Sequence, residues 1–418
     1  MSRTRDRSRR FDIVLWGATG FTGKLVAEYF VEHYLNTDLK LALAGRSLSK
    51  LEALRTELAR LDPAARDLTL LVGDSFDKDS LSAIAKDTEV VCTTVGPYAK
   101  YGAELVAACV DHGTDYCDLT GETLFIREMI DLHHKRAQET GARIVHCCGF
   151  DSIPSDIGTW MMHRAMEEQG ATLREVRFYA GESKGGLSGG TIASMLNLLE
   201  QAKKNPKVRK VMGHPYGLNP EGERSGPDGS DFMGVRYDRD LAMWVGPFIM
   251  AAINTRIVRR TNAILGFPYG RDFRYSEVMS FGRGPKGFAM ASSFAAGMAG
   301  FVTAASIDVS RKFMQKRFLP KPGEGPSREA REKGYFVVRL VAEGQTQSGE
   351  SIELRGRVEG RKDPGYGETA KMLGESALCL ALDGAKLETP GGVRTPASTM
   401  GDVLLQRLRD ADMVFQVR

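Results

Sequence analysis

The feature that most constrains the fold is a glycine-rich turn near the start of the chain. An apolar run rich in strand-forming residues, 11–16, leads directly into a GATGFTG turn at 17–23, and a helical pattern follows over 24–34. This order lets the backbone approach a pyrophosphate closely and aim helix N-terminal amides at it. We therefore predict a dinucleotide-binding turn, against the alternative of an accidental glycine-rich turn. Its predicted contact residues are Gly17, Thr19, Gly20, Phe21, Thr22 and Gly23.

The second predicted strand, residues 39–44, indicates which dinucleotide is bound. A site for NAD usually has an acidic residue after this strand to hold the ribose 2′-hydroxyl, but here the sequence continues Gly45-Arg46-Ser47. A guanidinium matches a phosphate through two parallel hydrogen bonds, so Arg46, with Ser47 and Lys50, suits a 2′-phosphate. We predict NADP(H); the alternative is that Arg46 only caps a surface turn.

Four further strands with intervening helices are predicted over 68–72, 90–95, 114–119 and 143–148. This alternation predicts a doubly wound α/β domain of the Rossmann type, whose ligand crevice lies at the carboxyl ends of the strands. Asp74 would then accept a hydrogen bond from the adenine amino group. Val95, Gly96 and Pro97 would border the ribose and nicotinamide.

Charge and cysteine content exclude several classes of protein. Lys and Arg number 57 against 53 Asp and Glu, a net charge of +4 that provides no broad basic face for nucleic acid. Six scattered cysteines form no CxxC pair, which indicates a reduced compartment, no structural zinc and a cytoplasmic protein. No metal site is predicted. The first ten residues contain five arginines and no apolar stretch, which is typical of a disordered basic tail.

The second half has a different rhythm and predicts an α+β substrate or dimerisation domain. A helix is expected over 157–169, a strand over 176–180, and antiparallel strands over 334–342 and 351–358. The glycine-rich residues 181–190 would bind an anion, cover the nicotinamide, or form only a flexible turn. The polar stretch 219–230 is expected to be an exposed excursion. The predicted units are 1–10 (tail), 11–156 (NADP-binding), 157–368 (α+β) and 369–418 (C-terminal helices that pack back on the first domain).

Residues 287–307 form a run of 21 residues without a charge, flanked by basic residues on both sides. Fourteen of them are Ala, Gly, Ser or Thr, so we do not interpret the run as a transmembrane span. Met290, Phe294, Met298 and Phe301 fall on one helical face, which favours a core helix or the interface of a homodimer. The sharper alternative is a helix that rests on the inner face of the plasma membrane or accepts an acyl chain.

Motifs along nearly the whole chain carry a resemblance to a known family. The motifs GATGFTG, AGRS, TVGPY, DYCDLTGE and CGFDSIPSD occur in this order, and GGLSGGTIAS, INTRIVRRTNA, FRYSE and TPASTMGDVLL follow them. With these motifs the chain resembles the saccharopine-dehydrogenase-like oxidoreductases, especially the mycobacterial trans-acting enoyl reductases. The resemblance implies an NADPH-dependent reduction of a carbon–carbon double bond in a polyketide or fatty-acyl intermediate, carried by a synthase that lacks a working reductase. No catalytic acid is transferred from the family.

Catalytic candidates come from the loops expected to face the nicotinamide. Such a reduction needs a hydride at Cβ and a proton at Cα, and Tyr98, Asp151 and Ser152 are the candidate proton-handling groups. Tyr98 is equally readily an aromatic wall of the pocket. Two other functions stay open, namely a catalytically weak NADP-binding module tethered to lipid or a partner, and a saccharopine-type dehydrogenase for an amino-acid-derived imine.

Overall fold

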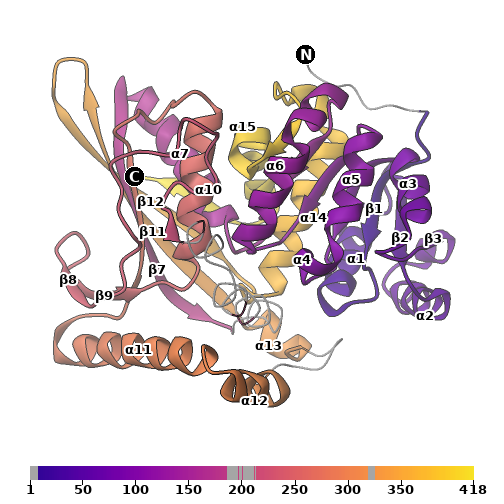
Figure 1. The fold of residues 1–418 in the computed structure, drawn as a ribbon, viewed down its shortest axis with the longest axis horizontal. Coiled ribbons are helices and arrows are strands. Elements are labelled where there is room, and N and C mark those ends of the chain that lie inside the picture. Colours follow the sequence, from indigo (N-terminus) through magenta and orange to yellow (C-terminus); the bar gives the residue numbers. More distant parts are fainter. Residues whose placement is uncertain (1–7, 186–195, 197–199, 201–210, 212, 319–324) are drawn as a thin grey trace.

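Two seven-stranded sheets organise the protein, and the first is built around the glycine turn (Figure 1). The computed structural model describes residues 8–418 except 186–195, 197–199, 201–210, 212 and 319–324. All neighbouring strands of the first sheet run parallel, in the order β13-β6-β5-β4-β1-β2-β3. Their bounds are β1 Phe11–Trp16, β2 Leu41–Gly45, β3 Thr69–Val72, β4 Thr88–Thr93, β5 Asp115–Asp118, β6 Arg143–Val145 and β13 Gly392–Arg394. The prediction of a doubly wound α/β domain is therefore confirmed.

Helices connect these strands and cover the sheet. They are α1 Phe21–Tyr34, α2 Leu48–Leu58, α3 Lys78–Lys86, α4 Tyr98–Tyr101, α5 Ala103–Asp111 and α6 Thr123–Thr140. The sixth strand is shorter than predicted, because Cys147 has a positive φ of 65° and its amide donates to the Asp118 carboxylate at 3.2 Å. The short helix α4 directly precedes α5, and Gly102 stands between them.

The tail prediction needs a correction at Arg9, while residues 1–7 lie outside the described residues. The Arg9 guanidinium donates to the Thr114 hydroxyl at 2.7 Å and to the His112 carbonyl at 2.8 Å. It also lies 3.9 Å from a carboxylate oxygen of Glu89. Arg9 is thus anchored against the first sheet, since its donors find partners at the starts of β4 and β5.

The second sheet is mixed and has the order β14-β12-β11-β7-β10-β9-β8. Its centre is an antiparallel group of long strands, in which β11 pairs with β12 as the sequence predicts, with Val338 opposite Val358. Helix α7 (Ile153–Glu168) packs on β7 and β12, between the two sheets. The strands are β7 Ala171–Lys184, β8 Arg236–Asp238, β9 Met243–Pro247, β10 Arg274–Ser280, β11 Tyr335–Thr346, β12 Ser351–Gly360 and β14 Val414–Val417.

The C-terminal part of the chain contributes to both sheets. Helix α14 (Gly367–Leu382) packs against α1, β4 and β5 of the first sheet, and α15 (Pro396–Asp410) packs against α7 and α14. Strand β13 adds to the edge of the first sheet beside β6, whereas β14 adds to the edge of the second beside β12. The predicted C-terminal helices are therefore present and α14 packs on the first domain, while the short strands β13 and β14, which were not predicted, add to two sheet edges.

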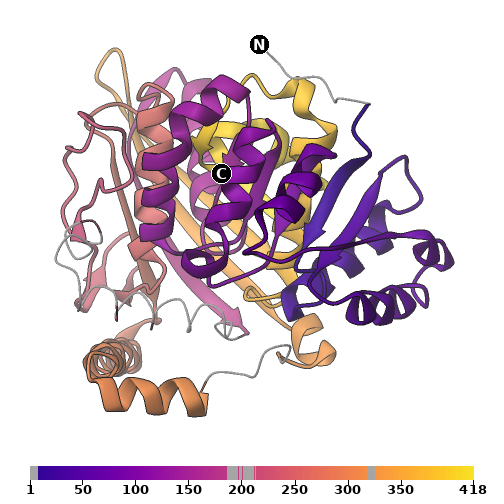
Figure 2. The ribbon, with the colours of Figure 1, turned by 45° about the vertical axis from the view of Figure 1, so that its right-hand side comes forward.

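Four more helices among the described residues belong to the second half and differ sharply in burial. Helix α10 (Ala251–Ile264) is almost wholly buried, between α7 and β10. Helix α11 (Gly284–Ala305) runs with α12 (Asp308–Phe318) beneath the rest of the molecule in both ribbon views (Figures 1 and 2). Helix α13 (Arg328–Glu332) follows and lies near the start of α1.

Candidate active site

The glycine turn forms a cradle between β1 and α1. Gly17 has a φ of +85°, and a Cβ there would lie 2.4 Å from a methyl carbon of Val95. A Cβ on Gly23 would lie 2.2 Å from the Gly17 carbonyl oxygen, so glycine lets the helix pack onto the turn. Gly20 caps α1 without a side chain, and the first turn of the helix contains no acidic residue. These residues fit a bound pyrophosphate, because the helix N-terminus offers uncapped amides to an anion.

The end of β4 lies directly against this cradle. The Thr94 hydroxyl donates to the Gly17 carbonyl at 3.3 Å, and Val95 contacts the same glycine. Gly96 is exposed and Pro97 is partly exposed beyond them. The predicted ribose-binding residues Val95, Gly96 and Pro97 are therefore next to the predicted pyrophosphate turn.

The carboxyl end of β2 carries the predicted 2′-phosphate group. Arg46 and Lys50 are exposed there, while Ser47 caps α2 by accepting from the Lys50 amide at 3.5 Å. The Thr19 hydroxyl lies on the side of the cradle that faces Gly45, just before Arg46. Ser47 therefore serves as a helix cap. Arg46 and Lys50 are the exposed cationic groups that this edge offers to a phosphate.

Asp74 lies at the end of β3, one strand further from the cradle. Its carboxylate accepts the Phe76 amide at 2.9 Å, and its own amide donates to the Ser80 hydroxyl at 3.4 Å. These bonds fix a tight turn and leave Asp74 partly exposed. Its contact with an adenine stays a prediction.

The ring of Phe21 contacts the second half of the chain, while Thr22 beside it is partly exposed on the first turn of α1. The Phe21 ring makes an edge-to-face contact with Tyr366 at 4.8 Å between centroids, and the Arg331 guanidinium lies 5.4 Å from its centroid. A Cβ on Gly325 would lie 2.3 Å from the same ring. The side chain thus points to segments from the second half, so only the backbone of Phe21 is available to a cofactor.

Tyr98 is not placed for proton transfer. Its side chain is 4% exposed, and its hydroxyl donates to the Thr93 carbonyl at 3.2 Å. Burial raises the pKa of this phenol well above its usual value. The ring packs near Phe125, so Tyr98 is a wall of the first domain's core and its catalytic assignment is wrong.

Asp151 has a different environment on the loop between β6 and α7. It is partly exposed, and no described residue donates a hydrogen bond or forms an ion pair with its carboxylate. One carboxylate oxygen lies 3.8 Å from the position a Cβ on Gly121 would take, in the loop after β5. Burial raises the pKa of Asp151 to about 7. A carboxyl with this pKa exchanges protons readily near neutral pH.

Ser152 is fully buried and begins a chain of polar contacts that the sequence did not reveal. Its hydroxyl donates to the Asn254 side-chain carbonyl at 2.9 Å, and the Asn254 amide donates to Glu277 at 3.0 Å. The Tyr275 hydroxyl donates to the other oxygen of Glu277 at 2.7 Å. Burial raises the pKa of Glu277 to about 7. Ser152 therefore positions the loop that carries Asp151 and does not face a substrate, which corrects its catalytic assignment.

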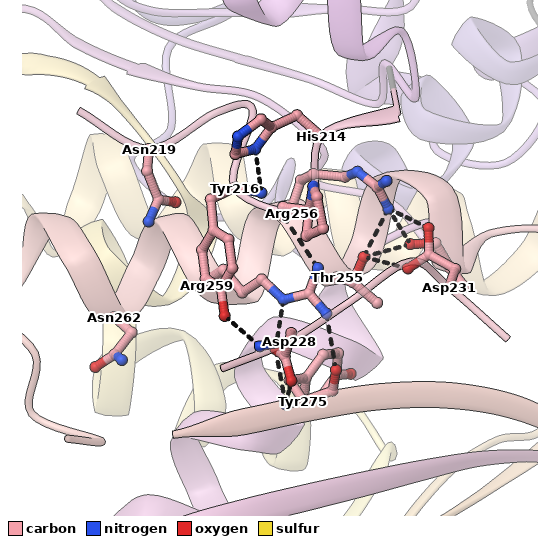
Figure 3. A network of polar contacts seen from close by, with 12 residues as sticks. His214, Tyr216, Asn219, Asp228, Asp231, Thr255, Arg256, Arg259, Asn262 and Tyr275 are labelled. Atoms are coloured by element: carbon pink, nitrogen blue, oxygen red, sulfur yellow. Dashed lines mark hydrogen bonds and ion pairs between the residues drawn. The ribbon is translucent and has the colours of Figure 1, made fainter. Parts of the chain in front are cut away.

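Ion pairs hold the loop before β8 onto α10 (Figure 3). Arg259 donates to Asp228 at 2.7 Å and to the Tyr275 carbonyl at 3.0 Å, and Arg256 forms an ion pair with Asp231. The Tyr216 hydroxyl accepts the Asp228 amide at 2.9 Å. The stretch 219–230 is therefore exposed at several positions, as expected, but pinned to the protein through Asp228.

Three of the motifs noted in the sequence meet around one buried carboxylate. Asp156, at the start of α7, accepts the Thr261 hydroxyl at 2.5 Å and the Ala397 amide at 2.8 Å. Burial raises its pKa to about 7. The motif GGLSGGTIAS lies mostly outside the described residues. The other three motifs carry polar residues within helical patterns. Hydropathy alone assigns such residues to the surface, but here they meet in the interior.

The chain matches known proteins over nearly all of its length. A family model described as the saccharopine dehydrogenase NADP binding domain matches residues 13–145. A protein of Mycobacterium tuberculosis H37Rv, named provisionally as a trans-acting enoyl reductase, is 45% identical over 422 residues, which cover 98% of this chain and 97% of that protein. The trans-acting enoyl reductase of Mycobacterium bovis BCG is 41% identical over 426 residues and covers 97% of both chains.

A solved structure supports the fold. The chain is similar to apo saccharopine dehydrogenase (L-Glu forming) from Saccharomyces cerevisiae, with a TM-score of 0.55 and 14% identity over 97% of this chain and 99% of that one. The family match confirms an NADP-binding domain and with it the predicted cofactor, NADP(H). The chain belongs to the saccharopine-dehydrogenase-like oxidoreductases, in the family of the mycobacterial trans-acting enoyl reductases.

Proposed function

We propose that the protein is an NADPH-dependent enoyl reductase that acts on a polyketide or fatty-acyl intermediate. The observation that carries this proposal is the 41–45% identity, over almost the whole chain, to relatives named trans-acting enoyl reductases. The cradle of Gly17, Gly20 and Gly23, with Arg46 beyond it, supports the cofactor requirement. The imine-dehydrogenase alternative has only fold-level likeness in its favour.

The reaction adds two hydrogens across a conjugated double bond. When bound, NADPH supplies the hydride that forms the new bond at Cβ, and the electron pair of the double bond moves to Cα as an enolate. A proton from the enzyme then forms the second bond at Cα. The products are the saturated acyl chain and NADP⁺, so the protein must regain one proton from solvent in each cycle.

We propose that Asp151 supplies this proton. Its loop follows β6, so it lies at the same carboxyl edge of the parallel sheet as the cradle and the end of β4. With a pKa of about 7 it is about half protonated at neutral pH, and its partial exposure allows reprotonation. The chain of Ser152, Asn254 and Glu277 holds this loop in place.

The partners follow from the same assignment. A trans-acting reductase requires a synthase and its acyl substrate, and we propose that the substrate arrives bound to a carrier protein of that synthase. We also propose that the protein forms a homodimer. We propose further that it is cytoplasmic and contacts the inner face of the plasma membrane through the exposed helix α11.

The test is consumption of NADPH with a long-chain 2-enoyl thioester, with mass spectrometry of the acyl product. We expect one saturated product per NADPH consumed, and a loss of kcat of about 10²- to 10⁴-fold in Asp151→Asn with NADPH affinity unchanged. Arg46→Ala should weaken NADPH binding about 10- to 100-fold and leave NADH binding unchanged, while Arg60→Ala, at an exposed site just after α2, serves as the matched control. NADPH binding without any reduction of free or carrier-bound enoyl thioesters would contradict the proposal.

A further inference from the structure

Large apolar side chains are concentrated on α11 and α12. In the described part of the chain thirteen large apolar side chains are exposed, and five of them lie between residues 288 and 313. We call these five the α11–α12 surface: Phe288, Met290, Ile307, Val309 and Phe313. An exposed concentration of this kind marks an interaction site, because single exposed apolar residues are scattered on ordinary surfaces.

Among the described residues, helix α11 is covered mainly on one side. Three of its 22 residues are buried, and its packing partners are mainly β9 and α12. At an α-helical rise of 1.5 Å per residue it is roughly 33 Å long, and both ribbon views place it with α12 outside the two-sheet body (Figures 1 and 2). It is the one helix among the described residues that is long and apolar enough to cross a membrane by length and composition, and only 11% of its most apolar window is buried.

Aromatic side chains extend this surface at the N-terminal end of α11. Phe288 packs on Trp244 with ring centroids 4.7 Å apart, and Trp244 contacts Tyr237 at 5.6 Å. Trp244 is partly exposed and Tyr237 is 49% exposed. Trp and Tyr favour the headgroup region of a bilayer, since their rings are apolar at one end and polar at the other.

The same segment is strongly basic. Residues 278–318 contain six Lys or Arg and one Asp, a net charge of +5, whereas the whole chain has +4. The remainder of the protein is therefore slightly acidic. Arg311 is paired with Asp308 at 3.1 Å and Glu200 at 3.6 Å, and the other basic residues flank the uncharged run at 283, 286, 312, 316 and 317.

We propose that the α11–α12 surface docks on an anionic phospholipid bilayer, with α11 in the plane of the interface. Basic residues at both ends of an apolar helix match anionic headgroups, and the apolar side chains between them match the acyl region. A second copy of the chain is disfavoured as the occupant, because it would place two segments of net charge +5 against each other. This membrane contact is separate from the reductase activity, and its binding can be measured without substrate or cofactor.

The experiment is flotation of the full-length protein with vesicles of phosphatidylcholine alone or mixed with phosphatidylglycerol. We expect binding to the mixed vesicles that weakens with salt, and a decrease of roughly tenfold or more in partitioning for Met290→Ser with Val309→Ser and for Arg283→Gln with Lys286→Gln. Leu132→Ser, at a 63% exposed site on α6, is the matched control and should bind as the unchanged protein does. Equal thermal unfolding of all variants verifies that they fold.

A second readout locates the contact. Trp244 is one of three tryptophans, and Trp16 is buried in the first domain. Phospholipids with brominated acyl chains should quench the emission of the unchanged protein, and Trp244→Phe should abolish that quenching while flotation persists. The proposal is overturned if mixed vesicles do not bind, if both double variants bind normally, or if the variants instead lose a concentration-dependent dimer or the capture of an acidic protein.

Discussion

Helix α10 carries three arginines and lies inside the protein, whereas α11 carries one lysine at its start and lies mostly at the surface. Hydropathy alone would place them the other way round. The polar groups of α10 have partners: Arg256 and Arg259 pair with Asp231 and Asp228, and Asn254 bonds Ser152 and Glu277. The difference teaches that a polar helix can be buried when its charged and polar groups have partners inside the protein. The exposed apolar helix α11 has a proposed partner outside the protein, the membrane.

The cost of burying α10 is visible at Arg260. This side chain is 1% exposed and donates to the carbonyl oxygens of Leu218 and Val393. Burial, together with nearby Arg127 and Arg394, lowers the pKa of its guanidinium to about 9. A buried charge whose neighbours are also cationic destabilises the helix unless other contacts offset it. Those contacts are the ion pairs of Arg256 with Asp231 and of Arg259 with Asp228.

The largest expected effect comes from removing one of these partners. Asp228→Asn leaves the buried Arg259 without its carboxylate and should lower the free energy of unfolding by about 3–5 kcal/mol. Urea denaturation followed by circular dichroism measures it. Glu223→Gln removes the partner of the exposed Arg271, at 2.9 Å, and should cost far less, because solvent screens the pair. Equal costs for the two variants would mean that the α10 pairs contribute no more than surface pairs.

A smaller effect on stability is expected from Glu277, whose carboxylate accepts a hydrogen bond from the Asn254 side-chain amide. The folded pKa of Glu277, about 7, lies above its usual 4.5, so its contribution to stability is complete below about pH 4.5 and is lost as pH rises through 7. Between pH 4.5 and 8 the unchanged protein should therefore lose about 3 kcal/mol more stability than Glu277→Gln. Denaturation across this pH range checks the slope. Glu350→Gln, on an exposed turn, should keep the slope of the unchanged protein.

Truncating one apolar side chain on each helix sharpens the comparison. Val258 of α10 is fully buried, and Val258→Ala should cost about 1–2 kcal/mol because it leaves a cavity. Met290 of α11 is 48% exposed, and Met290→Ala should cost under about 0.5 kcal/mol without membranes. Thermal unfolding in detergent-free buffer distinguishes them. A large loss at Met290 would show that α11 is part of the core.

The smallest expected effect is that of a charge placed on α11. Ala296 is exposed, so Ala296→Glu should change the free energy of unfolding by less than about 0.5 kcal/mol. The same substitution should reduce flotation with anionic vesicles, since it brings a carboxylate to the acyl region. Unfolding and flotation measured on one preparation separate the two effects. A marked loss of stability would contradict the exposed position of this face.

Local signals in the sequence sufficed for the cofactor domain. The cradle at Gly17 and Gly23 and the missing acid at Arg46 are encoded within a few residues of each other, and parallel strands with connecting helices follow a regular pattern. The direction of the Phe21 ring could not be predicted, because the ring packs on Tyr366, which lies far away in sequence. Tyr98 was misjudged, because short helix α4 turns its hydroxyl back toward Thr93.

The second half depends on contacts that no local pattern reveals. The bond between Asn254 and Glu277 joins α10 to β10, and Asn254 also reaches Ser152 on the loop after β6. The sequence shows these residues in the motifs INTRIVRRTNA and FRYSE, but a helix with three arginines is typical of a solvated face. Only the long-range pairing of charges explains why this helix is buried.

Strand β13 has a consequence for the order in which the protein is completed. Strand β6 ends at residue 145 and is synthesised early. The strand that covers its outer edge, β13, ends at residue 394 and is synthesised much later. The nascent cofactor domain therefore carries an open sheet edge while the whole second sheet, except β14, is being made. A ribosome stalled before residue 392 would hold an unfinished domain, and a fragment cut at residue 156 would be a template for aggregation instead of an independent NADP-binding module.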